Sequence, residues 1–99
     1  MGIFTSKREI GLDTILRREG NVLYNIIDNE VVILSAEHSE YYGLDKVASR
    51  IWTLLEKPIR FEDLVCKLMY EYEVSNEKCI EDTIEFINKL KNKNLIICD

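Results

Sequence analysis

The spacing of hydrophobic residues changes near residue 45, and this change divides the chain into a strand-rich part and a helical part. Before it, apolar side chains alternate or form short β-branched runs, a pattern typical of strands. Asp28 and Asn29 separate the first two runs and tolerate a positive φ, which predicts a tight hairpin turn. A polar turn at 37–39 leads to a third run. The expected strands are residues 22–27, with apolar side chains on both faces, 31–34 and 40–44.

After residue 45 the apolar residues recur with the period of an α-helix, and two helices are predicted before residue 75. Asp45 is placed to cap the first, and Pro58 ends it because the residue before a proline disfavours the α conformation. Trp52 is expected to anchor the core between this helix and the sheet. The apolar stripe of the first helix comprises Val47, Ile51, Leu54 and Leu55, and that of the second comprises Phe61, Leu64, Val65, Leu68 and Met69.

A third helix is predicted from a cap at Ser75 to about Lys93. It carries two adjacent apolar stripes, so it needs two neighbours, or one neighbour and an open groove. The basic residues in its last turns are expected to complement the helix dipole. One stripe comprises Ile80, Ile84 and Ile87, and the other comprises Cys79, Thr83, Phe86 and Leu90.

These elements predict an α+β domain in which a three-stranded antiparallel sheet precedes three helices. With 99 residues the chain can bury one modest hydrophobic core, so a single domain over residues 15–99 is expected. Residues 1–14 are weakly patterned and are expected to form an N-terminal arm that is ordered only in part. The short apolar tail at 95–97 is expected to pack back onto the core.

Composition and cysteine spacing exclude several classes of protein. No apolar run approaches the roughly 20 residues needed to cross a bilayer, and the N-terminus lacks the apolar segment of a signal peptide. We therefore expect a soluble, cytoplasmic protein with no membrane partner. Cys66, Cys79 and Cys98 lack the paired spacing of zinc sites and are expected to be reduced thiols, the first two buried. The single His38 cannot anchor a multi-histidine site, so no metal and no cofactor is expected.

The sequence contains no motif that predicts catalysis. No Ser/His/Asp grouping has a recognisable context, and the four glycines are too scattered to form a phosphate loop. The net charge of −5 disfavours nucleic acid as a partner, because Lys and Arg neutralise its phosphates. A winged-helix DNA-binding protein is an alternative, but the third helix begins with acidic residues that repel phosphate. These residues are Glu77, Glu81, Asp82 and Glu85.

Three short motifs, taken in order, resemble those of the PqqD family. They are Tyr41-Tyr42-x-Leu44-Asp45, Arg50-Ile51-Trp52-x-Leu54-Leu55 and Phe86-Ile87-x-x-Leu90. The resemblance covers residues 15–97, and it is the order and spacing of the motifs together that make it specific. Members of this family, known also as precursor-peptide recognition elements, are small winged-helix-like domains of three strands and three helices. The resemblance implies that the domain binds the leader segment of a ribosomally made precursor peptide and catalyses nothing itself.

The resemblance also implies how the leader binds. In this family the leader adds as an extra antiparallel strand beside the third strand and lies in a cleft against the third helix. Which of Tyr41 and Tyr42 faces that cleft stays open, because neighbouring strand residues point to opposite faces. Cys79 and Asp82 are expected at one end of the cleft. The implied peptide-binding residues are Glu40, Tyr41, Tyr42, Gly43, Cys79, Asp82, Thr83, Phe86 and Leu90.

The partners implied are a precursor leader peptide and an enzyme that receives it. The chain is most similar to the stand-alone recognition proteins of lasso-peptide clusters, which work with a separate leader peptidase and a cyclase. A PqqD-type chaperone that delivers its precursor to a radical SAM enzyme is the alternative within the family. The exposed strand also allows self-pairing, so either a monomer or a weak homodimer is expected. The acidic surplus favours a leader that carries Lys or Arg.

Overall fold

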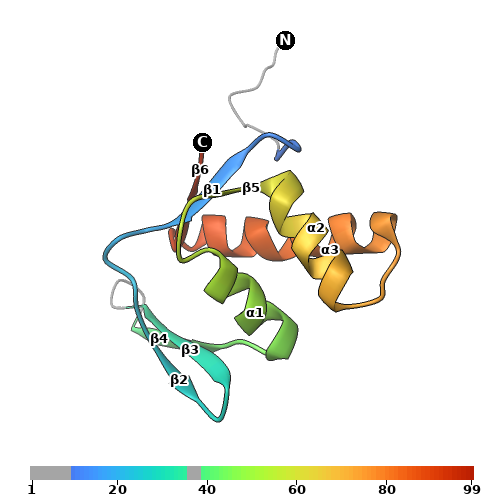
Figure 1. Ribbon diagram of the computed structural model, residues 1–99. Helices are drawn as coiled ribbons and strands as arrows, with labels where there is room; N and C mark the ends of the chain where they lie inside the picture. Colours follow the sequence, from blue (N-terminus) through green and yellow to red (C-terminus); the bar gives the residue numbers. More distant parts are fainter. Residues whose placement is uncertain (1–9, 36–38) are drawn as a thin grey trace.

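Figure 1 shows the computed structural model, which describes residues 10–35 and 39–99. Over these residues the domain comprises two small sheets and three helices. The expected turn at 37–39 lies outside the described residues except for Ser39. The strands are β1 (Ile15–Arg18), β2 (Leu23–Ile27), β3 (Glu30–Ser35), β4 (Glu40–Gly43), β5 (Ile59–Arg60) and β6 (Ile96–Cys98), and the helices are α1 (Lys46–Leu54), α2 (Phe61–Glu71) and α3 (Asn76–Asn92).

The predicted antiparallel sheet is present, in the order β2-β3-β4. Asp28 and Asn29 have φ angles of 53° and 68° and close the two-residue turn between β2 and β3, as predicted. On β3, Val31 and Ile33 are buried and the alternate residues Val32 and Leu34 are half-buried, so one face of the sheet forms part of the core. All five residues of β2, an edge strand of this sheet, are exposed.

A second antiparallel sheet, in the order β5-β1-β6, was not predicted. Its strands come from three distant parts of the chain, as the pairs Leu16↔Ile59 and Leu16↔Cys98 show. The tail at 95–97 packs onto the core, as expected, and does so by pairing with β1. Contact with the domain begins before residue 15, because the Leu12 and Thr14 carbonyls accept hydrogen bonds from the α2 N-terminus. Residues 1–9 of the expected arm lie outside the described residues.

Both predicted helix caps are present. Asp45 accepts a hydrogen bond from the Ala48 N–H at 2.8 Å, and Ser75 accepts one from the Lys78 N–H at 3.3 Å. α1 packs on the buried face of β3, and α2 and α3 pack against each other and against the second sheet (Figure 1). Trp52 is fully buried, as predicted.

Two side chains are more exposed than expected. Val47 is 45% exposed although it belongs to the predicted α1 stripe, whereas Ile51 and Leu55 of that stripe are buried. Cys66 is exposed, so the prediction that it is buried was wrong. It lies two residues from both Leu64 and Leu68, which places it on the opposite side of α2 from these core residues. Cys79 is buried, as predicted.

The Ser49 hydroxyl joins α1 to the sheet. It accepts a hydrogen bond from the Val31 N–H at 2.9 Å and donates one to the Leu44 carbonyl at 3.1 Å. Ser49 itself is 5% exposed, so both backbone partners would lack a replacement from solvent if the hydroxyl were removed. This side chain therefore holds β3, the end of β4 and the start of α1 in one fixed arrangement.

We predict that Ser49→Ala lowers the free energy of unfolding by about 1–3 kcal/mol, because two buried backbone groups lose their partner. Urea denaturation followed by circular dichroism measures this change. Thr53→Ala is the matched control, since that hydroxyl bonds only to a carbonyl one turn back in its own helix. We expect the control to change stability by less than about 0.5 kcal/mol. Equal effects of the two substitutions would contradict this role of Ser49.

Candidate functional site

The site is built on the outer edge of β4. This strand pairs with β3 on one side, and no other strand in the described part of the chain lies on its second side. The Leu44 N–H donates to the Val31 carbonyl at 2.9 Å. Because main-chain groups alternate along an antiparallel strand, those of Tyr42 also face β3 and those of Tyr41 and Gly43 face the open edge. β4 thus presents main-chain donors and acceptors that a further strand can use.

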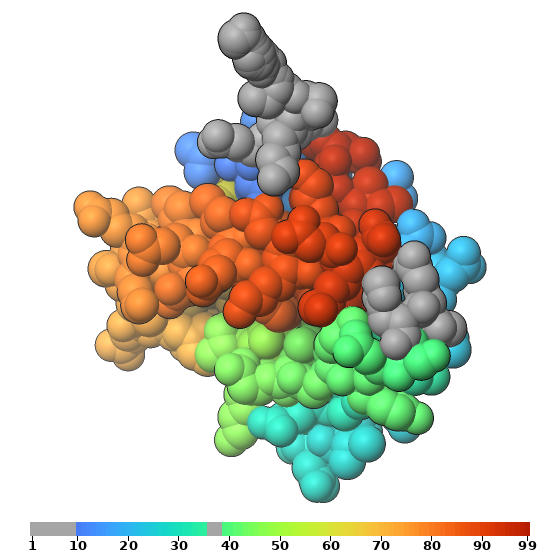
Figure 2. Space-filling model, turned by 180° about the vertical axis from the view of Figure 1, so that it is seen from behind, coloured from blue at the N-terminus to red at the C-terminus, as the bar shows by residue number. Residues whose placement is uncertain are grey.

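A groove runs from this edge along α3. Figure 2 shows that face of the molecule, where α3, in orange to red, lies along the green β4–α1 segment. Three hollows form the groove, and neighbouring hollows share lining residues. The β4 hollow, about 280 Å³, is lined by Tyr42, Gly43, Leu44, Asp45, Ala48, Phe86, Lys89, Leu90, Lys93 and Leu95. The middle hollow, about 300 Å³, is lined by Asp45, Val47, Ala48, Ile51, Asp82, Thr83 and Phe86. The α2 hollow, about 210 Å³, is lined by Val47, Leu68, Tyr72, Val74, Lys78, Cys79, Asp82 and Thr83.

The structure brings the predicted α3 residues together along this groove. Phe86 is half-buried and lies between the β4 and middle hollows. Leu90 and Thr83 are each 3% exposed, so they form parts of its floor. Cys79 and Asp82 line the α2 hollow, at the end of the groove farthest from β4, which agrees with the position expected for them. Their contact with a peptide stays a prediction.

Tyr42 and not Tyr41 faces the groove. Lys93, the C-cap residue of α3, lies over the Tyr42 ring, with Nζ 4.4 Å from the ring centroid, and the Tyr42 hydroxyl donates to Glu40 at 2.7 Å. This hydrogen bond, together with burial and the charge of Glu40, raises the pKa of the Tyr42 hydroxyl above its usual value. Tyr41 is 74% exposed and lies opposite Leu34 on the other face of the sheet. Glu40 therefore orients a groove residue.

Several groove residues were not predicted as part of the site. Val47 belongs to the predicted apolar stripe of α1, yet its exposed side chain lines both the middle and α2 hollows. Lys89 and Lys93 are among the basic residues expected to complement the helix dipole, and they also line the β4 hollow. Their spacing by four places them on one side of α3, in line with Phe86, and this is the signal that could have identified them.

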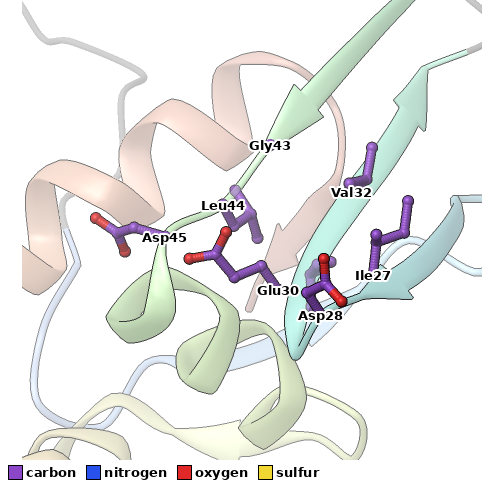
Figure 3. Close-up of a pocket in the computed structure, with 8 residues that line it drawn as sticks. Ile27, Asp28, Glu30, Val32, Gly43, Leu44 and Asp45 are labelled. Atoms are coloured by element: carbon purple, nitrogen blue, oxygen red, sulfur yellow. The ribbon is translucent and has the colours of Figure 1, made fainter.

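A fourth hollow lies at the hairpin end of the sheet, and Figure 3 shows its lining. Asp28, Glu30 and Asp45 contribute three carboxylates to this hollow, and its lining contains no basic residue. It adjoins the groove, because Gly43, Leu44 and Asp45 line both. Over residues 10–35 and 39–99 no group of three or more His, Cys, Asp or Glu side chains is arranged to hold a metal ion. None of the helices described here is long and apolar enough to cross a membrane.

The fold and the groove define a winged-helix-like α+β domain with an open strand edge beside a helix. The chain belongs to the PqqD family, because the family model for coenzyme PQQ synthesis protein D (PqqD) matches residues 30–96. No curated protein sequence gives a significant match. The resemblance inferred from the sequence motifs is therefore confirmed at the level of the family.

Solved structures show the same fold. TbiB1 in complex with the TbiA(beta) leader peptide is 39% identical, with a TM-score of 0.75 over 81% of this chain and 93% of TbiB1. A lasso peptide synthetase B1 complexed with the leader peptide is 22% identical, with a TM-score of 0.67 over 83% of this chain and 96% of that one. The PqqD truncation of Methylobacterium extorquens PqqCD, described as a RiPP recognition element, is 18% identical, with a TM-score of 0.69 over 84% of this chain and 88% of that one. The predicted fold class is thus confirmed.

An ion pair holds the α1 wall of the groove against α2. Arg50 makes two hydrogen bonds to the Glu71 carboxylate, at 2.8 and 2.7 Å. These bonds are the main cause of a lowered pKa of Glu71. A lowered folded-state pKa means that the pair stabilises the fold above the unfolded-state pKa of Glu, about 4.3, and that this contribution is lost as pH falls through the folded-state pKa.

We predict that Glu71→Gln lowers the free energy of unfolding by up to about 1 kcal/mol at pH 7, the usual range for a partly exposed pair. The difference from the parent protein should shrink below pH 4 or so and vanish once Glu71 is protonated. Urea denaturation at several pH values measures both effects. Glu73→Gln, at an exposed position just beyond α2, is the control and should be neutral at every pH. A deficit that persists at low pH would contradict the ion-pair explanation.

Proposed function

We propose that this protein binds the leader segment of a ribosomally made precursor peptide and presents it to a separate enzyme, without catalysing a reaction itself. The single observation that carries the proposal is the open edge of β4 beside the groove along α3. TbiB1, 39% identical to this chain over most of both lengths, is known in complex with a leader peptide. This likeness supports a leader peptide as the ligand, and the open edge of β4 beside α3 supports that place for it.

The leader would bind as a fourth strand of the sheet, antiparallel to β4. Its main-chain groups would pair with the outward N–H and C=O groups of Tyr41 and Gly43. Alternate side chains of the leader would then point toward α3 and enter the β4 hollow between Tyr42 and Phe86. Binding of this kind takes affinity from the main chain and specificity from the side chains of the groove.

We favour a lasso-peptide system as the setting, with a leader peptidase as the enzyme that receives the peptide in the cytoplasm. The resemblance of the sequence to stand-alone lasso-type recognition proteins supports this choice. A PqqD-type role beside a radical SAM enzyme is the second candidate, and the match of residues 30–96 to the PqqD model favours it. A pull-down with each kind of enzyme in the presence of leader peptide distinguishes the two.

The direct test is fluorescence-polarisation binding of labelled leader peptides from precursor genes that neighbour this one, with scrambled leaders as controls. We expect saturable binding of a native leader at micromolar concentration or below and none of its scrambled form. A folded protein that binds no neighbouring leader would overturn the proposed function.

We predict that Phe86→Ala weakens leader binding by about 2 kcal/mol, roughly 30-fold in Kd, because it removes the side chain shared by two hollows. The matched control is Ile84→Ala, since Ile84 is half-buried on the same helix and lines none of the groove hollows. Both variants lose some stability, so affinities are compared at a temperature where circular dichroism shows both folded. Equal affinity of the Phe86→Ala variant and the parent protein for the leader would mean that the leader binds elsewhere.

We predict that Gly43→Pro weakens leader binding at least about fivefold, because it removes one outward N–H of the β4 edge. Proline at Tyr42 would be a poorer test, since the Tyr42 main chain faces β3 and its loss would damage the sheet. Gly43→Ala is the matched control, because its N–H is retained and the added methyl group meets no atom within 4 Å. Strand addition at β4 is wrong if the proline variant, folded, binds the leader as tightly as the alanine variant.

A further inference from the structure

The groove carries opposite charges at different points along its length. In the middle hollow the charged side chains are the carboxylates of Asp45 and Asp82. In the β4 hollow the charged side chains are the ammonium groups of Lys89 and Lys93 and, where it meets the middle hollow, the carboxylate of Asp45, which lines both. Two neighbouring charges reduce this contrast without removing it: Lys78 lies 3.3 Å from Asp82, and Glu40 is bonded to the Tyr42 hydroxyl.

The lining of the middle hollow suits a long cationic side chain. Val47, Ala48, Ile51 and Phe86 provide apolar surface for the methylene groups of a Lys or Arg, and the carboxylates at the rim accept its charged end. Asp45 uses one oxygen to cap α1 and is an exposed residue, as is Asp82. A purely aliphatic side chain would fill the same space but would leave both carboxylates without a partner from the peptide.

The direction of the proposed strand decides the order in which a peptide meets these charges. β4 runs from Glu40 toward Asp45. A peptide antiparallel to it therefore has its N-terminal end beside Asp45 and its C-terminal end beside Glu40. Its N-terminal residues lie at the middle hollow, and its C-terminal residues lie near Lys89 and Lys93. A peptide bound in the reverse direction would meet the same charges in the opposite order.

We propose that the groove selects leaders by charge order, with a Lys or Arg that binds between Asp45 and Asp82 followed toward the C-terminus by an Asp or Glu that binds Lys89 and Lys93. This inference rests on the proposed function and assigns a side-chain class to two points of the same groove. It makes Asp82 and Lys89 specificity-determining residues.

The spacing between the two peptide charges follows from helix and strand geometry. Lys89 and Lys93, the latter the C-cap residue of α3, lie seven and eleven residues after Asp82, which at 1.5 Å per residue is about 10 to 17 Å. An extended peptide rises about 3.3 Å per residue, so this distance corresponds to roughly three to five residues. Because alternate side chains of a strand share a face, a separation of about four residues points both charges toward α3.

The experiment is a selection from an mRNA-displayed library of random 14-residue peptides on the full-length protein, followed by Kd measurements on the enriched peptides. The test variant carries Asp82→Lys together with Lys89→Glu, which reverses one charge at each of the two points and leaves the net charge unchanged. The control variant carries Glu81→Lys together with Lys91→Glu, an equal exchange at two α3 positions that line no hollow of the groove. Both variants are first shown to be folded by circular dichroism.

We expect peptides enriched on the parent protein to carry Lys or Arg about four residues before Asp or Glu and the control variant to enrich the same order. The test variant should enrich no such order, because Asp45 and Lys93 keep the original order while residues 82 and 89 oppose it. Exchanging the two charges within an enriched peptide should weaken its binding about fivefold, and less at high salt. Enriched peptides without this order, or with an order that the test variant does not change, would overturn the inference and leave leader binding intact. Failure of the folded protein to enrich any peptide or to bind a neighbouring leader would overturn both.

Discussion

The groove depends on the buried hydrogen bonds that the Ser49 hydroxyl makes at the junction of sheet and helix. Ser49 bonds to the Val31 N–H and the Leu44 carbonyl, and the Leu44 N–H bonds back to the Val31 carbonyl. These three bonds fix the end of β4 at the point where it becomes α1. The open edge and the α1 wall consequently belong to one rigid unit, which limits the entropy that a bound strand must overcome.

The second support of the site is a cluster of Trp52, Arg18 and Tyr24 that joins the two sheets to α1. The Arg18 guanidinium lies 4.5 Å from the centre of the Trp52 ring and donates to the Trp52 carbonyl, while the Tyr24 ring meets Trp52 edge-on. Arg18 belongs to β1 and Tyr24 to β2. This cluster holds the β5-β1-β6 sheet, whose strands are only two to four residues long, to the same core as the helices.

The sequence predicted those elements whose signal is local. Asp28-Asn29, Asp45 and Ser75 each determine a turn or cap through their own side chains or backbone preference, so the first sheet and the helices could be read directly. The second sheet could not, because its strands are too short for a periodic pattern and pair across most of the chain. In the groove, the apolar stripe of α3 was visible in the sequence. The exposure of Val47 was not, because a helical stripe of apolar residues does not show which of them are buried and which line an open groove.

An open strand edge allows the same mode of peptide binding while the side chains around it diverge. Structures of this fold that are 18 to 39% identical to the chain superpose with TM-scores of 0.67 to 0.75. A strand added at β4 needs only main-chain groups in the right place, and these are set by the backbone rather than by particular side chains. Side chains of α3 and of the first turn of α1 can then differ between proteins that bind different peptides. The positions that distinguish one leader from another are therefore expected on the groove wall, where Asp45, Asp82 and Lys89 lie, and not on the β4 edge itself.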